Sequence, residues 1–299
     1  MTTQLLSVQG MSETGAFDLL DVSEATRTDY KYRISMFLDF TSTNGLQRDS
    51  FIHYKRFLKG RTDFSVSTKN KYLSTAKIFL KEANRQGLLA ADITQNTHGF
   101  NQSSKHKVDG LNDQEIETLA ASLAALPETP ENSRLQAIIT LLALQGLRQI
   151  ELARLDVSDI DLIGKTALVL GKGRDDKERI ALQPETVNAL HTYLKSNKKA
   201  DGALFTSNSY NGKNERLTTR SIRRIVQTAL KAAGITKTTH GFRHYYATKL
   251  IKDYRGDLPT VARYTRHKSI ETLQVYNDAI IEKADLPKYY GVFSGLSFA

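Results

Sequence analysis

The stretch that decides how this chain folds and works begins Thr-His-Gly-Phe-Arg-His-Tyr-Tyr-Ala-Thr, over residues 239–248. It ends Tyr-Thr-Arg-His-Lys-Ser-Ile-Glu-Thr-Leu-Gln-Val-Tyr, over residues 264–276. In the first part, His240 and Arg243 are three positions apart. A helix over residues 241–254 would therefore project both side chains from one face.

The second part places a histidine and a tyrosine at a fixed offset. Tyr276 follows His267 by nine positions and lies on a second predicted helix, which Ser269 can cap. Two imidazoles, a guanidinium and a phenol that converge suit phosphate chemistry better than sugar or carbonyl chemistry. Arginine clamps phosphate oxygens, histidine donates or carries a proton, and tyrosine offers an oxygen nucleophile for a covalent intermediate.

Positive charge is concentrated around this stretch. The 299-residue chain carries a net charge of +10, and its length suggests two domains. The segment from Lys165 to Arg255 has 19 Lys and Arg against 7 Asp and Glu, which gives +12, while the remainder sums to −2. This clustering favours a nucleic-acid partner over the alternative, a diffusely solvated basic surface.

The composition also excludes several classes of site. With no cysteine, the chain can form neither disulfides nor thiolate metal sites. The sequence has no signal-peptide pattern at its start and no apolar run near 18 residues. We therefore expect a soluble cytoplasmic protein with no membrane partner.

Four motifs, in order, resemble the tyrosine recombinase family of site-specific recombinases and integrases. The pair His240 and Arg243 resembles the second box of this family, and Tyr276 has the offset of its nucleophile from the third-box histidine. Residues 145–152, Gln-Gly-Leu-Arg-Gln-Ile-Glu-Leu, resemble the first box, and Gly-Lys-Gly over residues 171–173 resembles the catalytic-lysine hairpin. The resemblance covers nearly the whole chain.

The resemblance implies six catalytic residues: Arg148, Lys172, His240, Arg243, His267 and Tyr276. The two arginines would bind the non-bridging phosphate oxygens, and the tyrosine would form a 3′-phosphotyrosyl link. The lysine would protonate the leaving oxygen, with Lys177 in the same turn as its rival. The histidines would hold phosphate oxygens or shuttle protons, and the sequence does not apportion these duties. Glu151 would orient Arg148 or another site residue, or would be a surface acid. The scheme requires no metal or other cofactor.

The sequence departs from the family pattern next to the third box. Thr265-Arg266 stands where the family has Leu-Gly, which bears on the placement of His267 and makes Arg266 a candidate phosphate contact. Gln145 stands where threonine is common, and Phe242 where leucine is common.

The expected fold is mainly α with a small β-sheet, and the resemblance implies that it forms a two-domain C-shaped clamp. Apolar spacing predicts helices over residues 23–44, 49–59 and 65–86, with Phe57 facing inward on the second. Other helices are predicted to begin near 112, 133, 184 and 218, and the one from 133 would carry Arg148 at its end. Strands are predicted over residues 166–170 and 179–182. The expected parts are an N-terminal arm (1–20), a helical core-binding domain (21–100), a linker (101–111), a mixed α/β catalytic domain (112–277) and a tail (278–299).

Polar helix faces supply the candidate DNA contacts. On the helix over 65–86 they are Lys71, Ser74 and Lys77, and on the helix near 218 they are Arg220, Arg223 and Arg224. Plain solvent exposure is the alternative for such faces. The apolar tail either covers its own core or, as the resemblance implies, docks into a neighbouring protomer.

The resulting hypothesis is a site-specific recombinase that acts as a homotetramer on double-stranded DNA. About 20 residues precede the helical domain, so we expect a simple target of two inverted half-sites around a spacer. Accessory recombination proteins stay open as partners. The alternatives are a type IB-like topoisomerase and a catalytically silent DNA-binding regulator.

Overall fold

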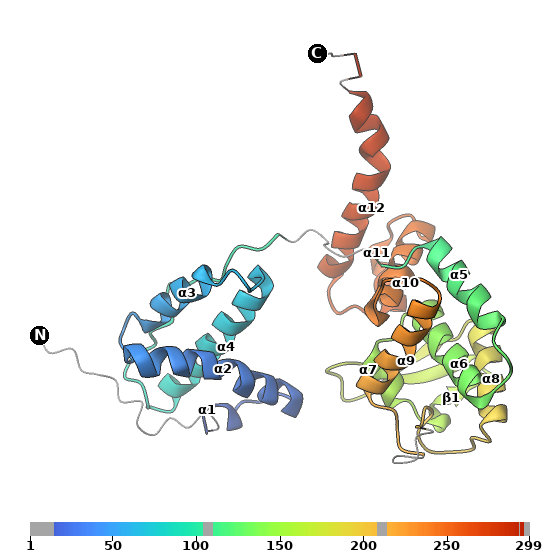
Figure 1. Ribbon diagram of the computed structural model, residues 1–299, viewed down its shortest axis with the longest axis horizontal. Coiled ribbons are helices and arrows are strands. Elements are labelled where there is room, and N and C mark those ends of the chain that lie inside the picture. The colour runs from blue at the N-terminus through green and yellow to red at the C-terminus, as the bar shows by residue number, and fades with distance from the viewer. Residues whose placement is uncertain (1–14, 104–109, 208–213, 293, 296–299) are drawn as a thin grey trace, which may run out of the picture. The chain divides into compact units, whose positions relative to one another are not determined.

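The chain divides into two compact units, one on each side of the junction between Ser104 and Lys105. The computed structural model describes residues 15–103, 110–207, 214–292 and 294–295 (Figure 1). Each unit has its own hydrophobic core.

Unit 1, as far as it is described, is helical. Its helices are α1 (Gly15–Asp18), α2 (Glu24–Asn44), α3 (Ser50–Gly60) and α4 (Val66–Arg85). Ser23 and Ser65 cap α2 and α4, because each hydroxyl accepts the backbone N–H three residues on. The core is rich in aromatic rings, with Phe37 and Tyr54 in edge contact at 5.0 Å between ring centroids. The sequence therefore predicts these helix positions closely.

Two expectations for unit 1 are wrong in detail. Residues 15–20 are not part of a loose arm, because Phe17 of α1 is fully buried against Tyr30 and Phe79. The earlier part of the expected arm lies outside the described residues. Phe57 was expected to face inward, but 39% of it is exposed and it packs at the rim, against the ring of Phe40.

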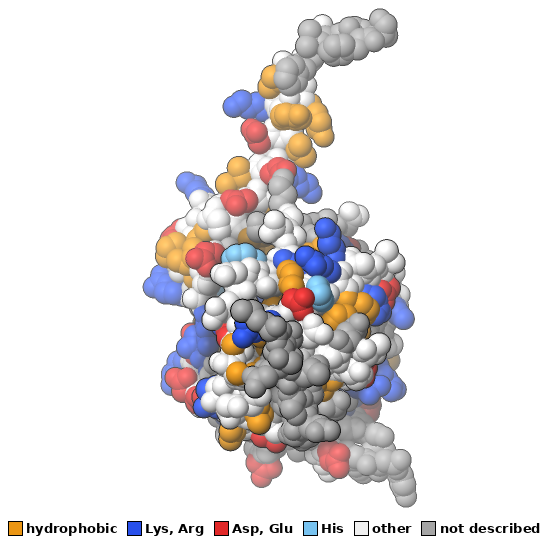
Figure 2. All heavy atoms as spheres, turned by 90° about the vertical axis from the view of Figure 1, so that its left-hand side faces the viewer, with side chains coloured by type: hydrophobic (Ala, Val, Ile, Leu, Met, Phe, Trp, Pro, Cys, Tyr) orange, Lys and Arg blue, Asp and Glu red, His pale blue; other side chains and the backbone are white. Residues whose placement is uncertain are grey.

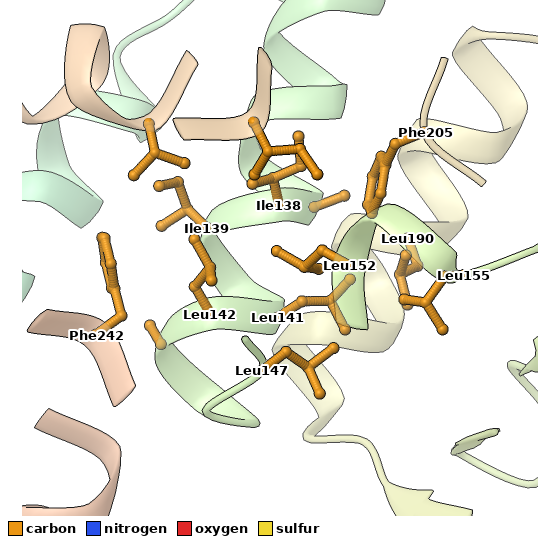
Figure 3. Packing of buried hydrophobic residues seen from close by; sticks show 14 of the residues in the cluster. Ile138, Ile139, Leu141, Leu142, Leu147, Leu152, Leu155, Leu190, Phe205 and Phe242 are labelled. Atoms are coloured by element: carbon orange, nitrogen blue, oxygen red, sulfur yellow. The ribbon is translucent and has the colours of Figure 1, made fainter. Parts of the chain in front are cut away.

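Unit 2 is built around α6 (Pro130–Leu144), an apolar helix that other helices enclose. These are α5 (Asp113–Ala124), α7 (Gln149–Arg154), α8 (Pro184–Ser196), α9 (Thr219–Ala232) and α10 (Thr239–Asp253). The last two helices, α11 (Leu258–Thr265) and α12 (Ile270–Gly291), pack against α10 and each other. Asn112 forms a capping box with Glu115 at the start of α5. In Figure 3, Ile139 and Leu142 of α6 lie toward Phe242 of α10.

Two helix positions differ from expectation in unit 2. The helix predicted to begin at Ser133 begins at Pro130, because Thr129 accepts the Asn132 backbone N–H and proline fits the first turn. This helix ends at Leu144, so Arg148 starts α7 instead of lying at the end of α6. The short helix α11 was not predicted.

A small antiparallel sheet covers one side of unit 2. Its strands, in the order β1-β2-β3, are β1 (Ile160–Asp161), β2 (Thr166–Leu170) and β3 (Lys177–Ala181). Ala167 and Val169 of β2 face the core. The register pairs Leu170 with Lys177, so the turn between β2 and β3 carries Lys172. The expected mainly helical fold with a small sheet is confirmed, although β3 starts two residues before its prediction and β1 was missed.

The last helix, α12, has a buried beginning and an exposed end. Leu273 is buried in a small core with Val261 of α11 and Ile251 of α10, and Tyr276 and Ile280 pack against this core. Beyond it, exposed apolar side chains follow: Ile281, Leu286, Tyr289, Tyr290 and Val292. Figure 2 shows hydrophobic side chains open to solvent along this end. The tail expected from residue 278 is thus a continuation of α12, and beyond Ile280 it leaves its own core.

None of the helices in the described ranges combines the length and the apolar character needed to cross a bilayer.

Candidate active site

One cavity of about 370 Å³ in unit 2 is lined by all six residues that the sequence singled out. These residues are Arg148, Lys172, His240, Arg243, His267 and Tyr276. They come from the start of α7, the β2–β3 turn, α10, the segment after α11, and α12. Four sequence motifs separated by as many as 128 positions, from the first to the last of these residues, therefore meet at one place.

Arg243 is held by two backbone carbonyls. Its Nη1 donates to the Gly146 carbonyl at 2.7 Å and its Nη2 donates to the Thr265 carbonyl, and only 3% of the residue is exposed. Gly146 has φ +59°, and a Cβ there would lie 2.3 Å from the Tyr246 ring. Glycine is thus required for the tight turn that aims this carbonyl at Arg243.

Burial makes the Arg243 charge costly in the absence of an anion. Burial lowers its pKa to about 9, and the neighbouring cations Arg148 and Arg266 act in the same direction. At neutral pH the guanidinium is still protonated. A bound phosphate would compensate this charge, so the cavity has the charge needed to hold an anion.

Glu151 joins two guanidiniums in the wall of the cavity. Its carboxylate accepts the Arg148 backbone N–H at 2.9 Å, Arg148 Nη1 at 2.8 Å and Arg266 Nη2 at 3.1 Å. Burial opposes its ionisation, but Arg266 and the groups of Arg148 outweigh burial, so the pKa of Glu151 lies below its ordinary value. Only 1% of Glu151 is exposed, so it orients Arg148 and is not a surface acid.

Arg266 is buried and engaged with protein groups. Besides Glu151, its guanidinium faces the carbonyls of Gln145 and Tyr264, at 3.5 and 3.3 Å. The backbone of Arg266 is left-handed, with φ +56°, which suits the glycine of the family pattern. The chain thus keeps the turn and adds a buried cation, whose pairing with Glu151 the sequence did not reveal.

His267 is held from both ring nitrogens. Nδ1 lies 2.6 Å from Thr265 Oγ1, and Nε2 lies 3.5 Å from Arg243 Nη2. Burial lowers its pKa to about 3, with Arg243 and Arg148 adding to the effect. The ring is therefore neutral at physiological pH.

Tyr276 packs beside a histidine that the sequence analysis missed. Its hydroxyl lies 3.5 Å from His244 Nε2, and the two rings meet edge to face at 4.9 Å between centroids. His244 also contacts the ring of His240 at 4.5 Å. The signal was present, because His244 is four positions after His240 on one helix face.

Burial raises the pKa of the Tyr276 phenol, although Arg243 and Arg148 act in the opposite direction. The phenol is therefore protonated in the free protein and must lose its proton during any attack. Ser269 precedes α12 as expected, but its hydroxyl donates a hydrogen bond to the Glu271 carboxylate and does not cap the helix backbone.

The two candidate lysines differ in their surroundings. Lys172 is exposed on the β2–β3 turn and lines the cavity, whereas Lys177 on β3 pairs with the buried Asp159. Lys268 Nζ donates to the Gly173 carbonyl at 3.0 Å and so ties this turn to the segment that carries His267.

The predicted DNA contacts lie on two helices of different units. On α4, Lys71 and Ser74 are exposed, while Lys77 Nζ donates to the Thr97 carbonyl at 3.3 Å. On α9, the three arginines are exposed on the face opposite Ile222 and Val226. These three are Arg220, Arg223 and Arg224.

The chain is similar to known proteins both in sequence and in fold. The chain is 29% identical over 261 residues to tyrosine recombinase XerC of Oceanobacillus iheyensis, covering 83% of each protein. It is 29% identical over 291 residues to XerD of the same organism, covering 90% of this chain and 92% of XerD. Among solved structures, the XerH recombinase bound to palindromic difH substrate in a post-cleavage complex has a similar fold. It gives a TM-score of 0.74 at 23% identity, over 88% of this chain and 79% of XerH.

A family model described as Phage integrase family matches residues 110–282. The match covers more than half of the chain and contains all six residues of the cavity. The chain belongs to the phage integrase family, and it is a tyrosine-type site-specific recombinase.

Proposed function

We propose that this recombinase cuts and rejoins DNA strands through a covalent 3′-phosphotyrosyl intermediate on Tyr276. The observation that carries the proposal is the convergence of the Tyr276 phenol, the Arg148 and Arg243 guanidiniums and the exposed Lys172 ammonium on the cavity of about 370 Å³. These groups are the ones that an in-line attack on a phosphodiester needs.

In the proposed step, the Tyr276 oxygen attacks the scissile phosphorus, and the bond from phosphorus to the 5′-oxygen breaks. The phenol proton passes to a base in the cavity, and Lys172 protonates the leaving 5′-oxygen. Arg148 and Arg243 neutralise the charge that grows on the non-bridging oxygens. Rejoining reverses the step, because a free 5′-hydroxyl attacks the phosphotyrosine and releases Tyr276.

We propose that both units bind the duplex. The exposed basic faces of α4 and α9 support this, as does the charge of +12 between Lys165 and Arg255. Arginine and lysine on such faces hold phosphates without reading sequence. In this scheme, residues 101–111 link the DNA-binding domain to the catalytic domain.

We propose a homotetramer on a target with inverted half-sites. The XerH structure contains a palindromic substrate, and lambda integrase has been solved as a tetramer on a Holliday junction, with a TM-score of 0.67 at 16% identity. The exposed apolar end of α12 supplies a surface for docking into a second copy, because Ile281, Tyr289 and Tyr290 leave their own core.

The proposal is tested with a nicked suicide substrate, which traps the covalent complex. Wild-type protein should accumulate a complex that resists detergent, and Tyr276→Phe should accumulate none while binding the duplex with similar affinity. Trapping by the phenylalanine variant would overturn the assignment. Duplex binding without any trapping by wild-type protein would instead support a DNA-binding regulator, and relaxation of plasmids that lack the target would support a topoisomerase.

A further inference from the structure

Thr265 lies directly behind the ring of His267. The residue is fully buried at the end of α11, and its Oγ1 is 2.6 Å from His267 Nδ1. The same Oγ1 is 2.8 Å from the Val261 carbonyl and 3.5 Å from the Ala262 carbonyl. The family pattern has leucine at this position, so the hydroxyl is a feature of this chain.

The threonine hydroxyl has one hydrogen, and its neighbours decide where that hydrogen goes. The carbonyl oxygen of Val261 can only accept a hydrogen bond, so the contact at 2.8 Å uses the hydroxyl hydrogen. Thr265 Oγ1 therefore directs a lone pair, and no hydrogen, toward His267. The contact of 2.6 Å is therefore satisfied when His267 Nδ1 carries a hydrogen and donates it.

The other ring nitrogen independently indicates the same tautomer. Nε2 faces Arg243 Nη2 at 3.5 Å, and a guanidinium has donors but no acceptor. A hydrogen on Nε2 would point at a positive group, whereas a lone pair there is attracted to it. Arg243 itself cannot turn away easily, because its Nη1 and Nη2 are anchored to the Gly146 and Thr265 carbonyls.

The doubly protonated ring is disfavoured by the cations around it. Arg148, Arg243 and Arg266 line the cavity, and Glu151 is paired with the first and the last of them. A second carboxylate of the lining, Glu178, pairs with Arg174. Burial and these arginines keep the pKa of His267 near 3, which agrees with a neutral ring.

We propose that Thr265 is a positioning residue that fixes His267 as the neutral Nδ1–H tautomer, so that Nε2 presents a lone pair to the cavity. In the free protein, His267 then offers Nε2 as a proton acceptor in the cavity, which suits the proton-shuttle duty. The tautomer is a property of the free protein, while its role in cleavage rests on the proposed function. The sequence left the duties of the two histidines open, and this arrangement assigns one of them.

The experiment is nitrogen-detected NMR on the full chain with ¹⁵N-labelled histidine at pH 7. The signals of His267 are assigned by their loss in His267→Gln. In the wild-type spectrum, we expect Nδ1 to show the shift of a protonated nitrogen and Nε2 that of an unprotonated one. An Nε2–H tautomer or a charged ring in wild-type protein would overturn the proposal.

Two variants isolate the hydroxyl. Thr265→Val keeps the shape but removes the acceptor, so His267 should lose its fixed Nδ1–H signature, and single-turnover cleavage should fall by about 10²-fold. Thr265→Ser should restore both the signature and the rate. An unchanged Nδ1–H signature in a folded Thr265→Val protein would also contradict the proposal.

These readouts separate the inference from the proposed function. If wild-type protein shows the expected tautomer but traps no DNA, the covalent mechanism fails and the tautomer assignment stands. If it traps DNA with the opposite tautomer, the mechanism stands and the role of Thr265 fails.

Discussion

The apolar core around α6 and the cavity beside it are both buried, but they are held together in opposite ways. Around α6, residues such as Ile138, Leu141 and Leu142 are fully buried and carry no charge. At the cavity, Glu151, Arg243 and Arg266 are at most 9% exposed and all ionisable. Burial stabilises the first region, whereas the second needs a paired carboxylate and fixed carbonyls to tolerate its charges. The apolar core therefore stabilises the fold, and this stabilisation offsets the cost of keeping buried cations at the cavity.

Removing the carboxylate should have the largest effect. Glu151→Ala leaves Arg148 and Arg266 without their buried partner, and breaking such a pair costs about 3–5 kcal/mol of unfolding free energy. Urea unfolding followed by circular dichroism measures this loss. Glu151→Gln keeps the shape and an acceptor, so it should lose less, and a loss below about 1 kcal/mol for Glu151→Ala would contradict the pairing.

A cavity in the core should lower stability but leave the chemistry intact. Leu142→Ala should lower the unfolding free energy by about 2–5 kcal/mol, because it removes buried methyl groups from a packed site. Cleavage of a suicide substrate at low temperature, where the variant is folded, should proceed at the wild-type rate. A large loss of rate in folded Leu142→Ala would show that the two regions are not separable.

Replacing Arg243 should instead slow the chemistry strongly and change the stability of the fold less. Arg243→Ala should slow single-turnover cleavage by about 10²–10³-fold, or roughly 2.7–4 kcal/mol in the barrier, because one donor to the charged transition state is lost. Its unfolding free energy should fall less than that of Leu142→Ala, since a costly buried charge is removed with the side chain. Arg243→Lys is the matched control, and wild-type cleavage by Arg243→Ala would contradict its assignment to phosphate.

The sequence predicted residues whose relations are local. The i, i+3 spacing of His240 and Arg243 and the capping signals of Ser23 and Ser65 each depend on a few neighbouring residues, and the structure agrees with them. The fold class followed from the same kind of evidence. The convergence of six residues was expected from the resemblance, and the structure brings all of them to one cavity.

The relations that were missed join distant parts of the chain. Arg266 meets Glu151 across 115 positions, and no local pattern reports such a pairing. Lys177 was the rival of Lys172 in the predicted turn, and β3 places it beside Asp159. The start of α6 is different, because Thr129-Pro130 was a readable cap and was overlooked in favour of the apolar spacing.

The unfolding free energy should fall by a smaller amount as the pH is lowered, because His267 titrates differently in the folded and unfolded chain. The pKa of His267 is depressed to about 3 in the folded protein, so the unfolded chain binds the proton more tightly. The stability that His267 contributes is complete above its unfolded pKa of about 6.5 and is lost as pH falls toward 3. Between pH 7 and 5, we expect a loss of roughly 1 kcal/mol, because solvent screens part of the ring. His267→Gln should remove this part of the slope, and an unchanged slope would contradict the burial of a neutral ring.

The central claim is that Tyr276 carries the DNA strand, and mass spectrometry of the trapped complex tests it most directly. Cleavage by trypsin after Lys268 and Lys283 gives a peptide of residues 269–283, in which Tyr276 is the one tyrosine. After nuclease trimming, we predict a nucleotide phosphate on this peptide, with fragmentation placing it on Tyr276. An adduct on any other peptide, such as those with Tyr245, Tyr264 or Tyr289, would contradict the account.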